Sequence, residues 1–82
     1  LNRGNRIDTL YHVFHRLYRN LPRDISNHFV YQVLFHLETR QGNRVKAQKY
    51  LDLLSKLDKK GVLKEKIEEM EGLLKNSVGN QL

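Results

Sequence analysis

Four histidines are the residues of this chain whose chemistry includes metal binding. His12 and His15 are three residues apart, so on a helix they would face the same side, and His28 and His36 follow eight residues apart. Zinc takes three or four protein ligands, and the chain has no cysteine to supply a thiolate. A four-histidine site would require two separate helices to turn matching faces toward each other. We therefore assign no metal ligand and expect surface or boundary histidines.

Hydroxyl and carboxyl groups do not form a catalytic pattern either. A serine nucleophile needs a base and an orienting group beside it, and Ser26 and Ser55 have the character of capping or surface residues. Glu68 and Glu69 are adjacent, so on a helix they point apart and make a poor acid/base pair. No glycine-rich phosphate loop is present. We predict no catalytic residue, no cofactor and no enzymatic activity.

Positive charge is the strongest chemical signal in the sequence. The formal net charge is +6, and residues 1–50 hold nine Lys and Arg against three Asp and Glu, whereas residues 51–82 are balanced. Such an asymmetry favours an anionic partner near the first half of the chain. The candidate residues for contacts to phosphates or to an acidic partner are Arg16, Arg19, Arg23, Arg40, Arg44, Lys46 and Lys49.

Helices are the elements that must position these residues. Apolar side chains recur at spacings of three and four in four segments, which predicts amphipathic helices over residues 7–19, 25–40, 44–58 and 62–75. Pro22 ends the first segment, Gly42 and Gly61 end the second and third, and Asp24 and Asn43 are candidate N-caps. The short connections predict antiparallel neighbours in an all-α fold, with no strand and a loose tail at residues 77–82.

The segment from Phe29 to Lys60 resembles one unit of the tetratricopeptide superfamily, and its closest variant is the half-a-TPR repeat of RNA-processing proteins. The slots of that repeat hold, in order, Tyr31, Leu34, Leu37-Glu38, Gly42 and Ala47. The consensus prefers Trp at Tyr31 and Arg at Gln48, and the repeat's proline is replaced by Lys59. Only this one unit is present, with a helix on each side.

Two architectures therefore remain open for the chain: a four-helix antiparallel bundle, or the end of a helical-repeat array with a C-terminal capping helix. The resemblance implies a protein-binding scaffold within a nuclear RNA-processing assembly. It transfers no catalytic residue.

Length and composition place limits on the class of protein. Eighty-two residues make one small domain, residues 1–82, and no apolar run reaches the roughly 20 residues that a membrane span needs. The absence of cysteine fits a reducing compartment, so we expect an intracellular protein, nuclear or cytoplasmic, that does not bind membranes. The sequence lacks an initiator Met, which suggests a fragment of a longer protein.

Three functional hypotheses follow. The first is a non-catalytic protein-protein interaction module, binding a helix or an acidic peptide through an exposed apolar strip of Tyr31, Phe35, Tyr50 and Leu53. The second is an RNA- or DNA-binding domain that contacts phosphates through its Arg-rich N-terminal half. The third is self-association through the fourth helix, using Leu63, Ile67, Met70 and Leu74.

Overall fold

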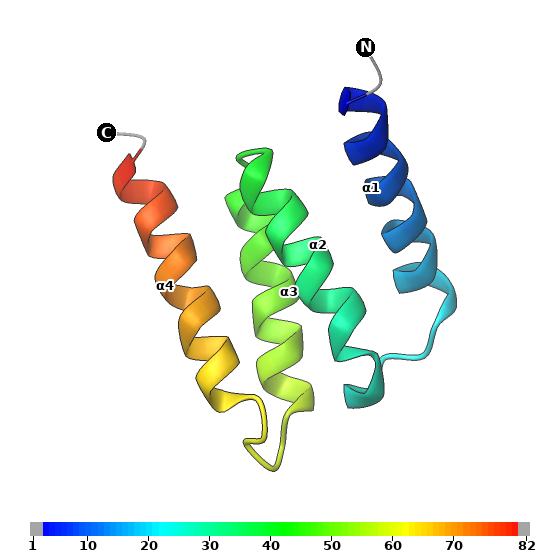
Figure 1. Ribbon diagram of the computed structural model, residues 1–82. Coiled ribbons are helices and arrows are strands. Elements are labelled where there is room, and N and C mark those ends of the chain that lie inside the picture. Colours follow the sequence, from blue (N-terminus) through cyan, green and yellow to red (C-terminus); the bar gives the residue numbers. More distant parts are fainter. Residues whose placement is uncertain (1–2, 81–82) are drawn as a thin grey trace.

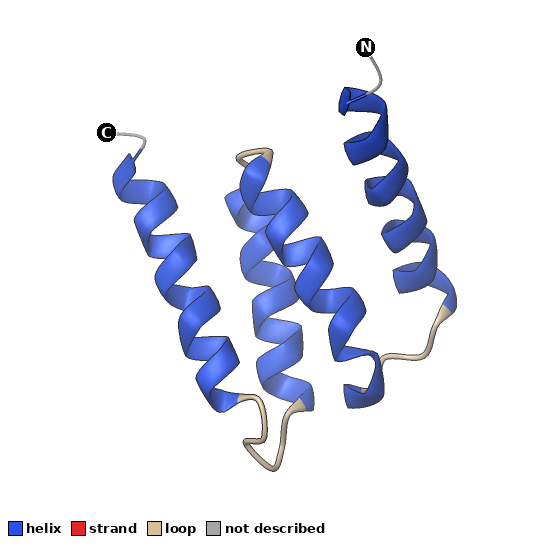
Figure 2. Cartoon of the chain, viewed as in Figure 1, coloured by secondary structure: helices blue, strands red, loops and turns tan. Residues whose placement is uncertain are grey.

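The computed structural model describes the backbone of residues 3–80 and the side chains of residues 9–76. Its elements are α1 (Arg3–Asn20), a short 3₁₀ helix η1 (Ile25–Asn27), α2 (His28–Arg40), α3 (Arg44–Leu57) and α4 (Lys64–Asn80), with no strand within residues 3–80 (Figures 1 and 2). The all-α fold predicted from the apolar spacing is confirmed.

The four helices pack in sequence order, each antiparallel to the one before it. Figure 1 shows α4, α3, α2 and α1 side by side, so that α1 and α4 form the two edges of the row. The Cα envelope measures 43 × 35 × 17 Å, which makes a flat molecule. The connections after α1 and after α3 lie at one end of the row, and the α2–α3 turn lies at the other end, with both termini.

The core is formed by α2, α3 and α4, because the described side chains of α1 are all half-buried or exposed. The buried apolar residues are Val30, Tyr31, Leu34, Phe35, Leu37, Ala47, Tyr50, Leu51, Leu54, Ile67, Met70 and Leu74. Helix α1 adds Phe14, Leu17 and Tyr18 from the outside. Its contribution is largely aromatic: the Tyr18 ring meets the Tyr50 ring edge-on, with centroids 5.2 Å apart.

The α2–α3 hairpin has the local features that the sequence predicts. Gly42 has φ of +81°, the left-handed conformation that ends a helix and that non-glycine residues adopt only with strain. The backbone N–H of Asn43 donates to the carbonyl oxygen of Glu38 at 2.8 Å, which closes the turn. Ala47 is fully buried, as expected for a small residue where two helices approach closely.

Two predicted caps have different outcomes. Asp24 caps η1, and its carboxylate accepts from the backbone N–H of Ser26 at 3.1 Å. Asn43 precedes α3 but makes no side-chain cap, and its amide nitrogen donates to the buried carboxylate of Glu38 at 2.8 Å. A buried carboxylate gains more from that hydrogen bond than an exposed helix end would.

The helix ends differ from the sequence expectation at both termini. Helix α1 begins at Arg3 rather than at residue 7, and α4 continues to Asn80. The tail predicted at residues 77–82 is thus helical through Asn80, while residues 81–82 lie outside the described residues. Helix α4 starts at Lys64, two residues later than predicted, because Asp58 accepts hydrogen bonds from the backbone N–H groups of Val62 and Leu63.

The apolar strip predicted to be exposed is buried, and that expectation is wrong. The relative solvent accessibilities of Tyr31, Phe35 and Tyr50 are 2%, 0% and 4%. Leu53 is half-buried against the same core. The reason is that α2 lies between α1 and α3, which cover most of its apolar side chains, although Phe29 stays 62% exposed. The face of α4 invoked for self-association is covered too: Ile67, Met70 and Leu74 are buried against the core and Leu63 packs against it.

Candidate functional site

A buried carboxylate joins α1, α2 and the α2–α3 turn near one end of the molecule. Glu38 on α2 has no exposed surface. Its Oε2 accepts from the Tyr11 hydroxyl at 2.8 Å and lies 3.2 Å from His15 Nε2, and its Oε1 accepts from the Asn43 amide at 2.8 Å. Helix α1 and the α2–α3 turn are thereby attached to one side chain.

These hydrogen bonds determine the charge state of the cluster. Burial raises the pKa of Glu38, but the hydrogen bonds from Tyr11, Asn43 and His15, with the positive charge of Lys46, outweigh burial and leave that pKa below its usual value. Burial and the neighbouring Glu38 raise the pKa of Tyr11 to about 12. Glu38 is therefore an ionised acceptor at neutral pH, held by neutral or cationic donors.

The Glu38 cluster stabilises the fold and offers little to a ligand. Each Glu38 oxygen already accepts a hydrogen bond, and no buried side-chain nitrogen or oxygen among the described residues lacks a partner. Among the side chains described, no three His, Asp or Glu residues are grouped closely enough to hold a metal ion. The histidines at positions 12, 15, 28 and 36 are half-buried or exposed.

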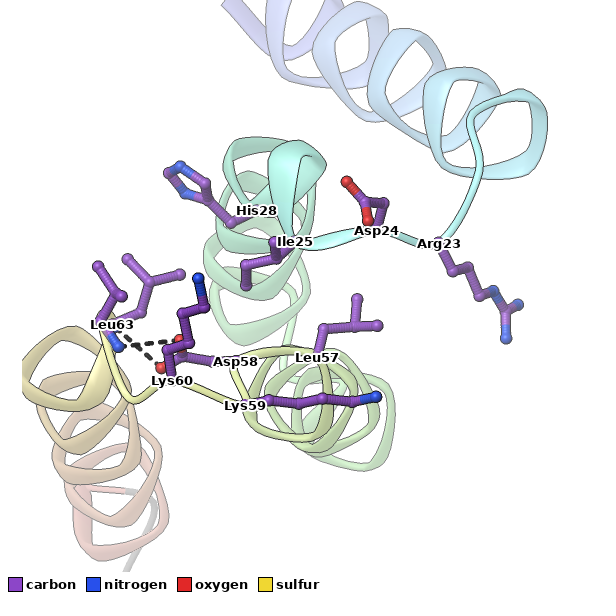
Figure 3. Close-up of a pocket in the computed structure, with 10 residues that line it drawn as sticks. Arg23, Asp24, Ile25, His28, Leu57, Asp58, Lys59, Lys60 and Leu63 are labelled. Carbon is purple, nitrogen blue, oxygen red and sulfur yellow. Dashed lines mark hydrogen bonds between the residues drawn. The ribbon is translucent and has the colours of Figure 1, made fainter.

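A surface cleft is the better candidate for binding. It has a volume of about 680 Å³ and opens between the start of α2 and the α3–α4 connection (Figure 3). We call it the end cleft, and the residues that line it are Arg23, Asp24, Ile25, His28, Leu57, Asp58, Lys59, Lys60, Val62 and Leu63. Its apolar part consists of half-buried Ile25, Leu57 and Leu63 together with Val62, whose side chain is 77% exposed.

The charged groups of the end cleft are not equally available. Asp58 accepts from the backbone N–H groups of Val62 and Leu63, at 3.0 and 2.9 Å. Asp24 is hydrogen-bonded by the Ser26 hydroxyl and backbone N–H, which lower its pKa, and Figure 3 shows its carboxylate turned away from Leu57. No ion pair within the described residues involves Arg23, Lys59 or Lys60.

The cations predicted from the sequence fall into two groups. Arg19 lies in the last turn of α1, and Arg23 lies in the connection that follows, where it lines the end cleft. The Arg23 guanidinium lies 5.2 Å from the centre of the Tyr18 ring. Arg40 and Arg44 flank the turn at the opposite end, with Lys46 and Lys49 on the first turns of α3. All seven predicted cations, Arg16 included, are exposed, but the fold does not bring them into one patch.

Sequence reasoning missed the contribution of the second half of the chain to this site. Lys59, Lys60 and Val62 belong to the half whose net charge is zero, and the fold places them beside Arg23. The predicted helix order already contains this information, because in a row of antiparallel helices the first and third connections lie at the same end. Their meeting could have been expected, although the cleft between them depends on side-chain packing.

Comparisons with known proteins give no relative for this chain. A scan of protein-family models, a search of curated proteins and a search of solved structures each find no match. No helix within the described residues is long and apolar enough to cross a membrane.

Proposed function

We propose that this chain is a non-catalytic interaction module that binds a segment of another protein in the end cleft. The observation that carries the proposal is the cleft itself, which combines an apolar floor with exposed cations that make no ion pair within the described residues. Protein-binding clefts of this kind use apolar contacts for affinity and charges at the rim for steering and orientation.

The exposed Val62 supports this assignment. A valine with 77% of its side chain exposed contributes little to stability, and here it adjoins the apolar floor of the cleft. The resemblance of residues 29–60 to a half-a-TPR unit supports the same class of function, since those repeats are mainly protein-binding scaffolds. It further suggests an RNA-processing assembly as the setting.

Selection from an unbiased displayed peptide library tests the proposal. Peptides enriched on the wild-type chain should lose binding to a Val62→Asp variant and keep binding to Val45→Asp. Both valines are strongly exposed, at 77% and 85%, and Val45 lies at the opposite end of the molecule. Enriched peptides that bind Val62→Asp as well as wild type, or no enrichment at all, would refute the use of this cleft.

Nucleic-acid binding is a second candidate, and one observation favours it. All seven predicted cations are exposed, and none makes an ion pair within the described residues. Such cations at both ends of a flat molecule could contact phosphates without reading sequence. The Tyr31 ring is buried, and Arg23 lies over that of Tyr18, so neither is freely available for stacking on a base.

Fluorescence anisotropy with single-stranded RNA and duplex DNA separates this candidate from the first. Phosphate contacts predict binding that falls at least tenfold between about 50 and 200 mM salt, and that weakens further in Arg40→Ala and Arg44→Ala variants. Undetectable binding at the lower salt concentration would eliminate it.

A further inference from the structure

We infer that the segment bound in the end cleft is acidic and amphipathic, with apolar side chains flanked by Asp or Glu. This inference rests on the proposed function and specifies its partner. It depends on three features of the cleft: the positions of the cations, the use of both carboxylates elsewhere, and the exposure of the apolar floor.

The cations lie on both sides of the apolar floor. In Figure 3, Arg23 and Lys59 extend toward one side of the cleft, while Lys60 and His28 lie on the other, near Ile25. Arg23, Lys59 and Lys60 are exposed and lack an ion pair among the described residues, and only the Arg23 guanidinium has an aromatic neighbour, the Tyr18 ring. A segment lying across Ile25 and Leu57 would thus have a cation within reach of each of its edges.

The two carboxylates of the cleft offset part of this charge, and both accept hydrogen bonds from the chain itself. The formal charge of its Lys, Arg and Asp side chains is only +1, from three cations and two aspartates. However, Asp58 accepts two backbone N–H groups that precede α4, and Asp24 is occupied by Ser26. The exposed cations outnumber these two hydrogen-bonded carboxylates, so the cleft keeps a net positive charge toward a ligand.

An apolar component is also required, because exposed charge pairs alone contribute little affinity. Exposed ion pairs are screened by solvent and must order two flexible side chains, whereas burying apolar side chains contributes more and fixes the position of the ligand. The half-buried Ile25, Leu57 and Leu63 together with Val62 provide a surface for one or two bulky apolar side chains. Charge complementarity then selects an acidic segment over a basic one.

Four probes test the inference by fluorescence anisotropy with the full chain. They are a labelled acidic amphipathic peptide, the same peptide with Lys at each acidic position, a scramble of the acidic peptide without an apolar face, and single-stranded RNA. The charge-reversal variant Lys59→Glu/Lys60→Glu is compared with Lys49→Glu/Lys75→Glu, which changes the net charge equally at residues that do not line the cleft. All four lysines are exposed.

The acidic amphipathic peptide should bind most tightly, and Lys59→Glu/Lys60→Glu should weaken it about tenfold or more, against a change of about twofold or less in the control. Equal binding of the basic peptide, the scramble or RNA, or equal loss in the two charge-reversal variants, would overturn the inference.

The proposed function and the inferred partner class can be tested separately. If the library selection yields peptides that require Val62 but are not acidic, the module stands and the partner class is wrong. If no peptide requires Val62, both fail.

Discussion

At the scale of single residues, Glu38 explains most about how this small domain is fixed in one arrangement. Its carboxylate is fully buried, and it accepts hydrogen bonds from α1 and from the α2–α3 turn. Breaking a buried charged network by removing one partner leaves the others unsatisfied, which is more costly than the loss of an exposed pair. Because α1 adds no fully buried side chain among those described, we expect its attachment to depend strongly on Glu38.

The Tyr11 hydroxyl provides a direct test of that attachment. Tyr11→Phe removes one hydrogen bond to a buried carboxylate, and we expect the free energy of unfolding to fall by about 1–2 kcal/mol. Tyr18→Phe is the matched control, because the Tyr18 hydroxyl makes no hydrogen bond within the described residues, and it should change stability by less than about 0.5 kcal/mol. Urea denaturation measures both, and equal effects would contradict the role given to Glu38.

The pH dependence of stability tests the charge of Glu38. Its pKa in the folded protein is below the ordinary value of 4.5, so its stabilising contribution is fully present above about pH 4.5 and is lost as pH falls through the lower, folded-state pKa. Glu38→Gln should therefore be less stable than wild type at neutral pH, by about 1–3 kcal/mol.

That difference should shrink toward about pH 3. Urea denaturation of both proteins across this pH range provides the measurement. A stability difference that stays constant with pH would show that folding does not lower the pKa of Glu38.

At the scale of elements, the sequence predicts the positions of the helices more accurately than it predicts which of their side chains are exposed. The spacing of apolar residues located all four helices, and Gly42 and Ala47 identified the central hairpin. It did not reveal that Tyr31, Phe35 and Tyr50 are core residues, because a helix that is apolar on more than one side can be sandwiched or can present an exposed strip. Only the packing of α1 and α3 against α2 decides whether the helix is sandwiched or presents an exposed apolar strip.

Helix ends were predicted less accurately, for a physical reason. Asp58 and Asn43 each have side chains that can cap a helix or bond elsewhere, and the choice depends on tertiary neighbours that local sequence does not show. Asn43 turns to Glu38, whereas Asp58 closes the connection before α4.

The hairpin turn makes a prediction at this scale. Gly42→Ala forces a left-handed conformation on a residue with a side chain, and we expect a loss of about 1–2 kcal/mol, although no atom lies within 4 Å of the added Cβ. Gly72→Ala within α4 also meets no atom within 4 Å, but its backbone is helical, so it should be neutral or stabilising by up to about 1 kcal/mol. Chemical denaturation distinguishes the two, and a tolerated Gly42→Ala would show that the turn is not held in this conformation.

At the scale of the whole molecule, the row of four helices brings two chain connections to one end and creates the end cleft. The charge asymmetry along the sequence directed attention to the first half, yet the cleft takes Arg23 from that half and Lys59 and Lys60 from the other. Candidate cations could thus be selected from composition, whereas their grouping could not, because it depends on which loops the topology places together.

We propose that the end cleft, and not the Gly42 end, is the binding surface. We would test it by titrating the ¹⁵N-labelled chain with the acidic amphipathic peptide and mapping amide chemical-shift changes by NMR. We expect the changes to concentrate in residues 23–28 and 57–63, which line the cleft, and to be small across residues 40–49. Changes centred on residues 40–49, or spread evenly over both ends, would contradict the claim.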